Sequence, residues 1–136
     1  MTTFQSFEDI KAWQEGRTLV KEIRKICKNE KVKRDFAFVD QATRAARSVC
    51  ANIAEGHDST TNPDFIKFLG YAKRSCAEVQ SHLHDALDEG YITKNEFTVL
   101  MDQARKICSM LAKLMQYLRN TDMTSRTGAL TKKTSN

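Results

Sequence analysis

Apolar residues recur at steps of three and four along four long segments of this chain, which is the period of an amphipathic α-helix. Helix breakers are scarce, since the 136 residues include a single proline and five glycines. We therefore expect helices at about residues 6–29, 35–56, 63–89 and 93–119, joined by short polar connections. Long helices with short connections pack alternately up and down. The sequence thus predicts an all-α fold, an antiparallel up-down-up-down four-helix bundle.

Residues that favour helix ends lie at the predicted boundaries. Ser6 followed by Asp9 has the spacing of a capping box, in which each residue binds the backbone N–H of the other. Thr93 and Glu96 repeat this spacing before the fourth predicted helix. Further start signals are Asp35 and Asn62-Pro63, and the glycines expected to stop a helix are Gly56 and Gly90.

The segment after residue 120 differs in composition from the rest of the chain. It is rich in Thr, Ser and Lys and shows no apolar period. Segments of this composition bury too little apolar surface to become ordered. We therefore expect one bundle domain at residues 1–120 and a disordered basic tail at residues 121–136.

Positive charge gathers near the end of the first predicted helix. The formal net charge of the chain is +5, and residues 21–34 contain seven basic and two acidic residues. Such a cluster suits the phosphates of RNA or DNA, although lysines at a helix C-terminus also complement the helix dipole. Asp85, Asp88 and Glu89 are expected at the same end of the bundle and could neutralise part of the charge. The candidate nucleic-acid-binding residues are Lys21, Lys25, Lys28, Lys31, Lys33 and Arg34.

The chain shows no sign of membrane insertion or export. No run approaches the roughly 20 apolar residues of a membrane span. The first residues include the acidic Glu8 and Asp9 and no apolar signal core. The four cysteines lack the density and close pairing of a secreted disulfide scaffold. We therefore expect a cytoplasmic protein without membrane contact.

Residue types used in catalytic and metal sites do not gather in the predicted fold. The cysteines fall one to a helix at different heights, and only Cys76 and Cys108 share a level, where both fit as small core residues. The chain has no Glu-x-x-His pair of the kind a di-iron bundle uses and no glycine-rich phosphate loop. We expect no catalytic residue, no metal and no cofactor. A bundle enzyme or metal carrier is the less favoured alternative.

A polar stripe runs along the second predicted helix, beside its small apolar residues. Its members follow steps of three, four, four and three, which keep them on one side of the helix. Ser75 and Glu78 of the third helix are expected level with Arg44, so we predict an Arg44–Glu78 ion pair. The stripe is a solvated face, a satisfied polar layer beside the core, or a contact surface for another subunit. Its members are Gln41, Arg44, Ser48, Asn52 and Glu55.

These polar residues also belong to a pattern shared with a known family. The pattern consists of Phe7, Ile10, Trp13 and Gln14, then Gln41-x-x-Arg44-Ala45-x-x-Ser48-Val49-x-x-Asn52-Ile53-Ala54-Glu55-Gly56, then Phe65, Phe68, Leu69, Ala72, Ser75 and Glu78, and finally Gly90-Tyr91-Ile92. With these residues, the stretch from about Phe7 to Arg119 resembles the four-helix-bundle protein family associated with intervening sequences in bacterial large-subunit ribosomal RNA genes. Arg47 and Cys50 depart from the pattern, since an aliphatic residue and a proline are usual there.

The resemblance implies a four-helix protomer that assembles as a ring, a pentamer, without enzymatic activity. It also implies kinship with accessory proteins of diversity-generating retroelements, similar pentameric bundles that bind nucleic acid and a reverse transcriptase. We therefore expect a non-enzymatic homo-oligomer that binds RNA or structured DNA through the basic surfaces of a ring. The alternative is a protein–protein adaptor or scaffold, for example an accessory subunit for a reverse transcriptase, without direct nucleic-acid contact.

Overall fold

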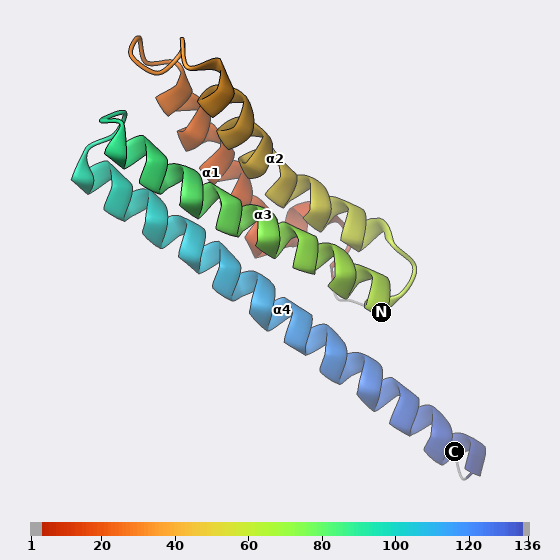
Figure 1. Cartoon of the computed structure of the whole chain (residues 1–136). Helices are drawn as coiled ribbons and strands as arrows, with labels where there is room; N and C mark the ends of the chain where they lie inside the picture. The colour runs from red at the N-terminus through yellow and green to blue at the C-terminus, as the bar shows by residue number, and fades with distance from the viewer. Residues whose placement is uncertain (1–3, 135–136) are drawn as a thin grey trace.

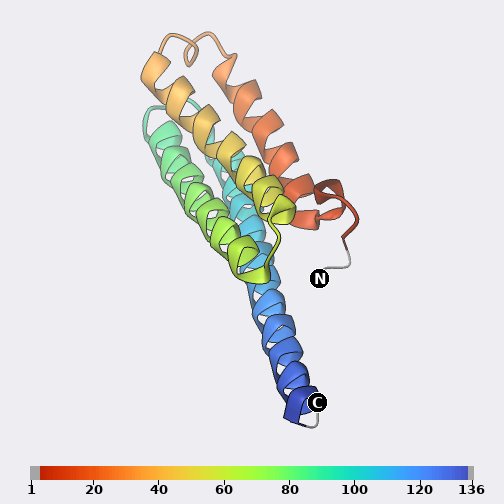
Figure 2. The same cartoon turned by 90° about the vertical axis from the view of Figure 1, so that its right-hand side faces the viewer.

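Four long helices make up the fold of this chain. The computed structural model describes residues 4–134, with side chains described up to residue 121. The elements are η1 (Phe7–Asp9, a short 3-10 helix), α1 (Lys11–Cys27), α2 (Phe36–Asp58), α3 (Asn62–Asp88) and α4 (Lys94–Thr134). Each α-helix runs antiparallel to the next and packs against it, and α4 also packs along α1 (Figure 1, Figure 2). Within residues 4–134 there is no strand. The predicted all-α, antiparallel four-helix bundle is confirmed.

The core lies along the axis between the helices. On α2 the inward positions Ala42, Ala45 and Ala46 are small and almost fully buried, so the neighbouring helices approach its backbone closely. Its neighbour α3 contributes bulky residues such as Phe65 and Leu69, both with no exposed surface. Removing the side chain of a buried leucine to leave alanine costs about 2–5 kcal/mol, because transfer energy is lost and a cavity remains. The core therefore fixes the register of the four helices.

The start of α1 differs from the prediction. The Asp9 carboxylate accepts a hydrogen bond from the backbone N–H of Ser6 at 3.3 Å, as a capping box requires, but the turn that it closes is η1. Ile10 then takes an extended conformation (φ −79°, ψ 118°) and buries its side chain in the core. The helix predicted from Ser6 therefore begins at Lys11, because burial of Ile10 interrupts the helical backbone.

The two glycines predicted to stop helices behave differently. Gly90 has a φ of +75° just after α3, the left-handed conformation expected of a helix stop. Gly56 lies inside α2, which continues to Asp58, so the prediction for this residue is wrong. A Cβ at Gly56 would lie 2.8 Å from a ring atom of Phe65. Gly56 therefore serves the close approach of α2 to α3.

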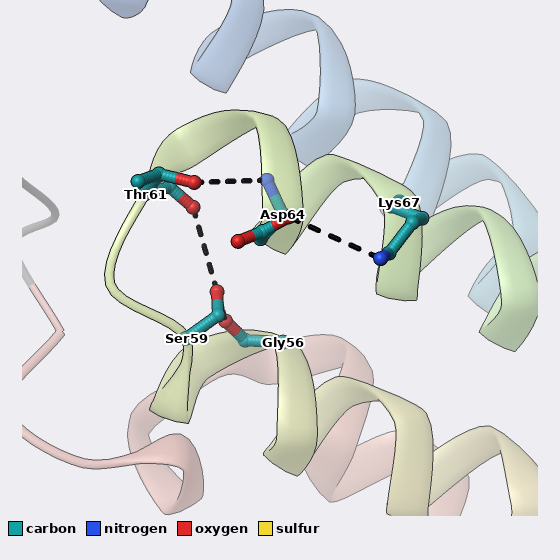
Figure 3. Close-up of polar contacts among 5 residues, drawn as sticks. All are labelled: Gly56, Ser59, Thr61, Asp64 and Lys67. Atoms are coloured by element: carbon teal, nitrogen blue, oxygen red, sulfur yellow. Dashed lines mark hydrogen bonds and ion pairs between the residues drawn. The ribbon is translucent and has the colours of Figure 1, made fainter.

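The connection from α2 to α3 is held by side-chain hydrogen bonds. Thr61, rather than the predicted Asn62, caps α3 by accepting from the backbone N–H of Asp64 at 3.2 Å (Figure 3). The Ser59 hydroxyl bonds the carbonyl oxygens of Gly56 and Thr61 across the turn. Asn62 is buried, and its Nδ2 donates to the carbonyl oxygen of Leu118 on α4 at 3.3 Å. The turn is thereby tied to three helices.

Helix α4 continues well past the other three and projects from the end of the bundle where α2 turns into α3 (Figure 1, Figure 2). The sequence predicts a disordered tail at residues 121–136, whereas the helix runs to Thr134. A helix that already exists gains one hydrogen bond for each residue added, so extension needs no further nucleation. Side chains of residues 122–136 lie outside the described part, and the division into bundle and tail stays a prediction. Within the described residues, no helix is both long and apolar enough to span a membrane.

Candidate functional site

The basic end comprises Lys21, Lys25, Lys28, Lys31, Lys33 and Arg34, on the last turns of α1 and the connection to α2. This connection lies beside the turn between α3 and α4 (Figure 1). Lys31 Nζ donates to the carbonyl oxygen of Gly90 at 3.1 Å, and Val32 is completely buried. These contacts hold the connection on the bundle in a defined position.

A second tie joins the same segments. The hydroxyl of Tyr91 donates to Oδ2 of Asp35 at 2.6 Å, while Oδ1 of Asp35 accepts from the backbone N–H of Phe38 and caps α2. The Tyr91 bond, and then the Phe38 bond, lower the pKa of Asp35. The same bond to Asp35, burial and the negative charges of Glu89 and Asp85 raise the pKa of Tyr91 to about 12. The start of α2 is therefore fixed to the α3–α4 turn by an ionised carboxylate.

The six basic side chains are all exposed, but they are not equally free. Lys33 forms an ion pair with Glu30 at 3.0 Å, and Lys31 is occupied by Gly90. Among the side chains described up to residue 121, no ion pair involves the other four. These four are Lys21, Lys25, Lys28 and Arg34. The three lysines are spaced four and three residues apart, which places them on one side of the end of α1.

Acidic residues lie at the same end of the molecule. Asp85 and Asp88 belong to the last turn of α3, Glu89 follows it, and all three are exposed. Within the described side chains, none of the three pairs with a basic residue of this end. The end therefore carries both signs of charge, with the cations on the last turns of α1 and the connection after it, and the carboxylates at the end of α3.

The predicted polar stripe is realised in part as a hydrogen-bonded cluster between α2 and α3. The Ser75 hydroxyl donates to Oγ of Ser48 at 2.9 Å. Nδ2 of Asn52 donates to the carbonyl oxygen of Ser48 at 2.9 Å and to its Oγ at 3.0 Å. Ser75 is buried, and Ser48 and Asn52 are half-buried. These three residues form the polar layer beside the core that the sequence suggests, whereas Glu55 is exposed.

The predicted Arg44–Glu78 ion pair is wrong. Arg44 instead pairs with Asp40 of its own helix at 3.1 Å, and both side chains are largely exposed. Asp40 lies one turn before Arg44, and this local pairing needs no reach across the helix interface. The predicted register is nevertheless correct, since residues of both helices line one open groove of about 400 Å³. The lining of this polar groove is Gln41, Arg44, Ala45, Ser48, Ser75, Glu78, Ser81 and His82.

Three residues of this surface were not predicted. Ser81 and His82 continue the α3 side of the polar groove by one turn, and Asp40 neutralises Arg44. The four-residue spacing of Asp40 and Arg44 is a sequence signal that could have revealed their pairing. Throughout the described residues, no three His, Cys, Asp or Glu side chains gather closely enough to hold a metal ion. The groove offers polar and charged contacts.

Comparison with known proteins identifies the family of this chain. The model of the 23S rRNA-intervening sequence protein family matches residues 8–113. The chain belongs to this family. The match spans α1 to α3 and most of the packed part of α4, so it includes both the basic end and the polar groove.

A solved structure supports the fold of this family member. It is a protein of unknown function from the S23 ribosomal protein family of Bacteroides thetaiotaomicron, 22% identical, with a TM-score of 0.70. The alignment covers 76% of this chain and 97% of the solved chain. The likeness therefore extends over the whole of the solved protein's fold. No curated protein matches the chain.

Proposed function

We propose that this family member is a non-enzymatic, oligomeric bundle protein that binds nucleic acid, RNA or structured DNA, through its basic end. The observation that carries the proposal is a set of four exposed cations that pair with none of the acidic side chains described up to residue 121: Lys21, Lys25, Lys28 and Arg34. Binding to phosphates releases condensed counterions, so such a surface gains affinity without reading base sequence. Because Lys31 and Tyr91 fix the adjoining connection, little conformational entropy is lost on binding.

A single protomer offers few phosphate contacts, and a ring would multiply them. We assign the contact between protomers to the face formed by α2 and α3, which carries the polar groove and the Ser48–Asn52–Ser75 cluster. Polar groups at an interface fix its register when each finds a partner. Linking several weak sites raises the overall affinity through effective concentration. The oligomer is therefore part of the proposed binding mechanism.

The proposal is tested by neutralising the three lysines of α1. In the variant Lys21→Gln/Lys25→Gln/Lys28→Gln, binding to a structured RNA measured by fluorescence anisotropy should weaken about tenfold or more. The matched control is Lys11→Gln/Lys67→Gln/Lys113→Gln, which removes the same charge from exposed positions away from the basic end. The control should bind almost as tightly as the unchanged protein. Equal losses in both variants would reduce the effect to net charge and contradict a defined site.

The second candidate function is a protein adaptor, and an aromatic cluster on α3 favours it. Tyr71 is 37% exposed, with Arg74 over its ring at 5.3 Å and the ring of Phe68 edge-on at 5.7 Å. Exposed tyrosine and arginine are frequent in the centres of protein interfaces. Charge reversal at Lys21, Lys25 and Lys28 distinguishes the two functions. It should abolish RNA binding, whereas a protein partner such as a reverse transcriptase should still bind.

A further inference from the structure

Two cysteines face each other across the α3–α4 interface in the middle of the bundle. Sγ of Cys76 on α3 lies 3.1 Å from the carbonyl oxygen of Ala104, one turn before Cys108 on α4. Nε2 of Gln80, one turn after Cys76, lies 3.4 Å from Sγ of Cys108. Because α3 and α4 are antiparallel, the Cys76–Ala104 and Gln80–Cys108 contacts place Cys76 and Cys108 at the same height along the interface.

The surroundings make the two thiols unequal. Cys76 has no exposed surface, and its bond to Cys108 and its burial raise its pKa. Cys108 is half-buried and accepts the amide N–H of Gln80. The hydrogen bond with Cys76, the positive charge of Lys73 and the Gln80 bond together lower the pKa of Cys108. A thiolate at Cys108 thus has donors on α3 that stabilise it.

The other two cysteines lack such an arrangement. Cys27 is buried beside the hydroxyl of Thr43 at 3.8 Å, and burial raises its pKa. Burial raises the pKa of Cys50 to about 11. Both therefore remain thiols at neutral pH and react slowly, since the thiolate is the nucleophile. They provide internal controls within the same molecule.

We propose that Cys108 is a modification site for hydroperoxides and that Cys76 is its resolving thiol. The Cys108 thiolate attacks one oxygen of hydrogen peroxide, forming a sulfenic acid and releasing hydroxide as the O–O bond breaks. Sγ of Cys76 then attacks the sulfenic sulfur while its own proton passes to the leaving hydroxyl group, and the S–O bond breaks to give a disulfide and water. Overall, two thiols are oxidised, one peroxide is reduced, and two waters leave. The product is a covalent link between α3 and α4.

Peroxide treatment of the reduced native protein tests the proposal. After hydrogen peroxide and N-ethylmaleimide, peptide mass spectrometry should find a Cys76–Cys108 disulfide, with Cys27 and Cys50 carrying maleimide. In Cys76→Ser, a sulfenic acid at Cys108 should persist and be trapped by dimedone. Oxidation of Cys27 or Cys50 as fast as Cys108 would overturn the proposal. So would a Cys108 sulfenic acid that persists in the unchanged protein without forming the disulfide.

A second measurement tests the role of the α3 donors. At pH 7, iodoacetamide should alkylate Cys108 roughly fivefold faster than Cys27, or more, since a larger thiolate fraction outweighs a lower intrinsic nucleophilicity. Gln80→Leu should slow alkylation of Cys108, whereas Gln116→Leu, at an exposed position of α4, should leave the rate unchanged. Far-ultraviolet circular dichroism establishes that both variants remain folded. An unchanged rate in folded Gln80→Leu would contradict the proposed activation of Cys108.

Discussion

The phenol of Tyr91 donates a 2.6 Å hydrogen bond to the carboxylate of Asp35, joining the α3–α4 turn to the residue that caps α2. The rings of Tyr91 and Phe38 also pack in a T-shaped arrangement, with centroids 5.3 Å apart. Two segments more than fifty residues apart in the chain are thereby fixed at the end of the bundle that carries the free lysines. The basic end is positioned by this contact together with the hydrogen bond from Lys31 to the carbonyl oxygen of Gly90.

The Asp35–Tyr91 bond predicts a pH dependence of stability. Asp35 has a lower pKa in the folded state than its ordinary 3.8, so its contribution is complete above that value and is lost as the pH falls through the lowered pKa. The pKa of Tyr91 is raised from 10.0 to about 12, so its contribution is complete below pH 10 and is lost as the pH rises between these values.

Urea denaturation of Tyr91→Phe tests this assignment. The variant should be less stable than the unchanged protein at pH 7, and the difference should shrink in acid as Asp35 is protonated and above pH 10 as the Tyr91 phenol ionises. Tyr117→Phe, which removes a hydroxyl from an exposed tyrosine of α4, is the control and should change little. A stability difference independent of pH would assign the effect to packing instead of the hydrogen bond.

Gly56 and Gly70 should respond in opposite ways to the same substitution. A Cβ at Gly56 would meet Phe65 at 2.8 Å and Phe68 at 3.0 Å, so Gly56→Ala should destabilise by about 1–3 kcal/mol through overpacking. The nearest atom to a Cβ at Gly70 is Cε of Met115 at 3.8 Å. Gly70→Ala should therefore stabilise by about 0.5–1 kcal/mol, because it lowers the entropy of the unfolded chain. Thermal melting measures both changes, and destabilisation by Gly70→Ala would contradict the packing described for α3 and α4.

The hydrogen bond between Ser48 and Ser75 should show coupling in a double-mutant cycle. Ser75→Ala should cost about 1 kcal/mol, because it leaves a partly buried hydroxyl of Ser48 with one partner fewer. Ser48→Ala should cost a similar amount, and the double variant less than the two together. Arg44→Met is the comparison, and it should cost under about 0.5 kcal/mol because its ion pair with Asp40 is exposed. Additive losses at Ser48 and Ser75 would mean that their hydrogen bond contributes nothing to stability.

The helices and some of their ends were predictable because they depend on local signals. Apolar spacing, the Thr93–Glu96 box and the left-handed Gly90 act within a few residues, and all are present in the structure. The misplaced start of α1 and the role of Gly56 depend on tertiary contacts. Ile10 leaves the helical conformation to enter the core, and Gly56 is required by Phe65 of another helix. Neither contact can be seen in a local pattern.

For the candidate site, the register of the two helices was predictable, but the partners of individual side chains were not. Helix geometry correctly placed Arg44, Ser75 and Glu78 along one groove, since register follows from the length of the turn. It did not reveal which partner each side chain selects. Arg44 pairs with Asp40 on its own helix, and Lys31 donates to the carbonyl oxygen of Gly90. These pairings depend on side-chain conformations in the folded protein, which the sequence does not specify.

The central claim is that phosphate contacts by the α1 lysines carry nucleic-acid binding, and the salt dependence of affinity tests it most directly. The logarithm of the association constant for a single-stranded RNA, plotted against the logarithm of salt concentration, should fall steeply for the unchanged protein. In Lys21→Gln/Lys25→Gln/Lys28→Gln the slope should become shallower by roughly 2, because each of the three lost phosphate contacts contributes about 0.7 to the slope. An affinity that stays flat across the salt series, or a slope that the triple substitution leaves unchanged, would contradict the account.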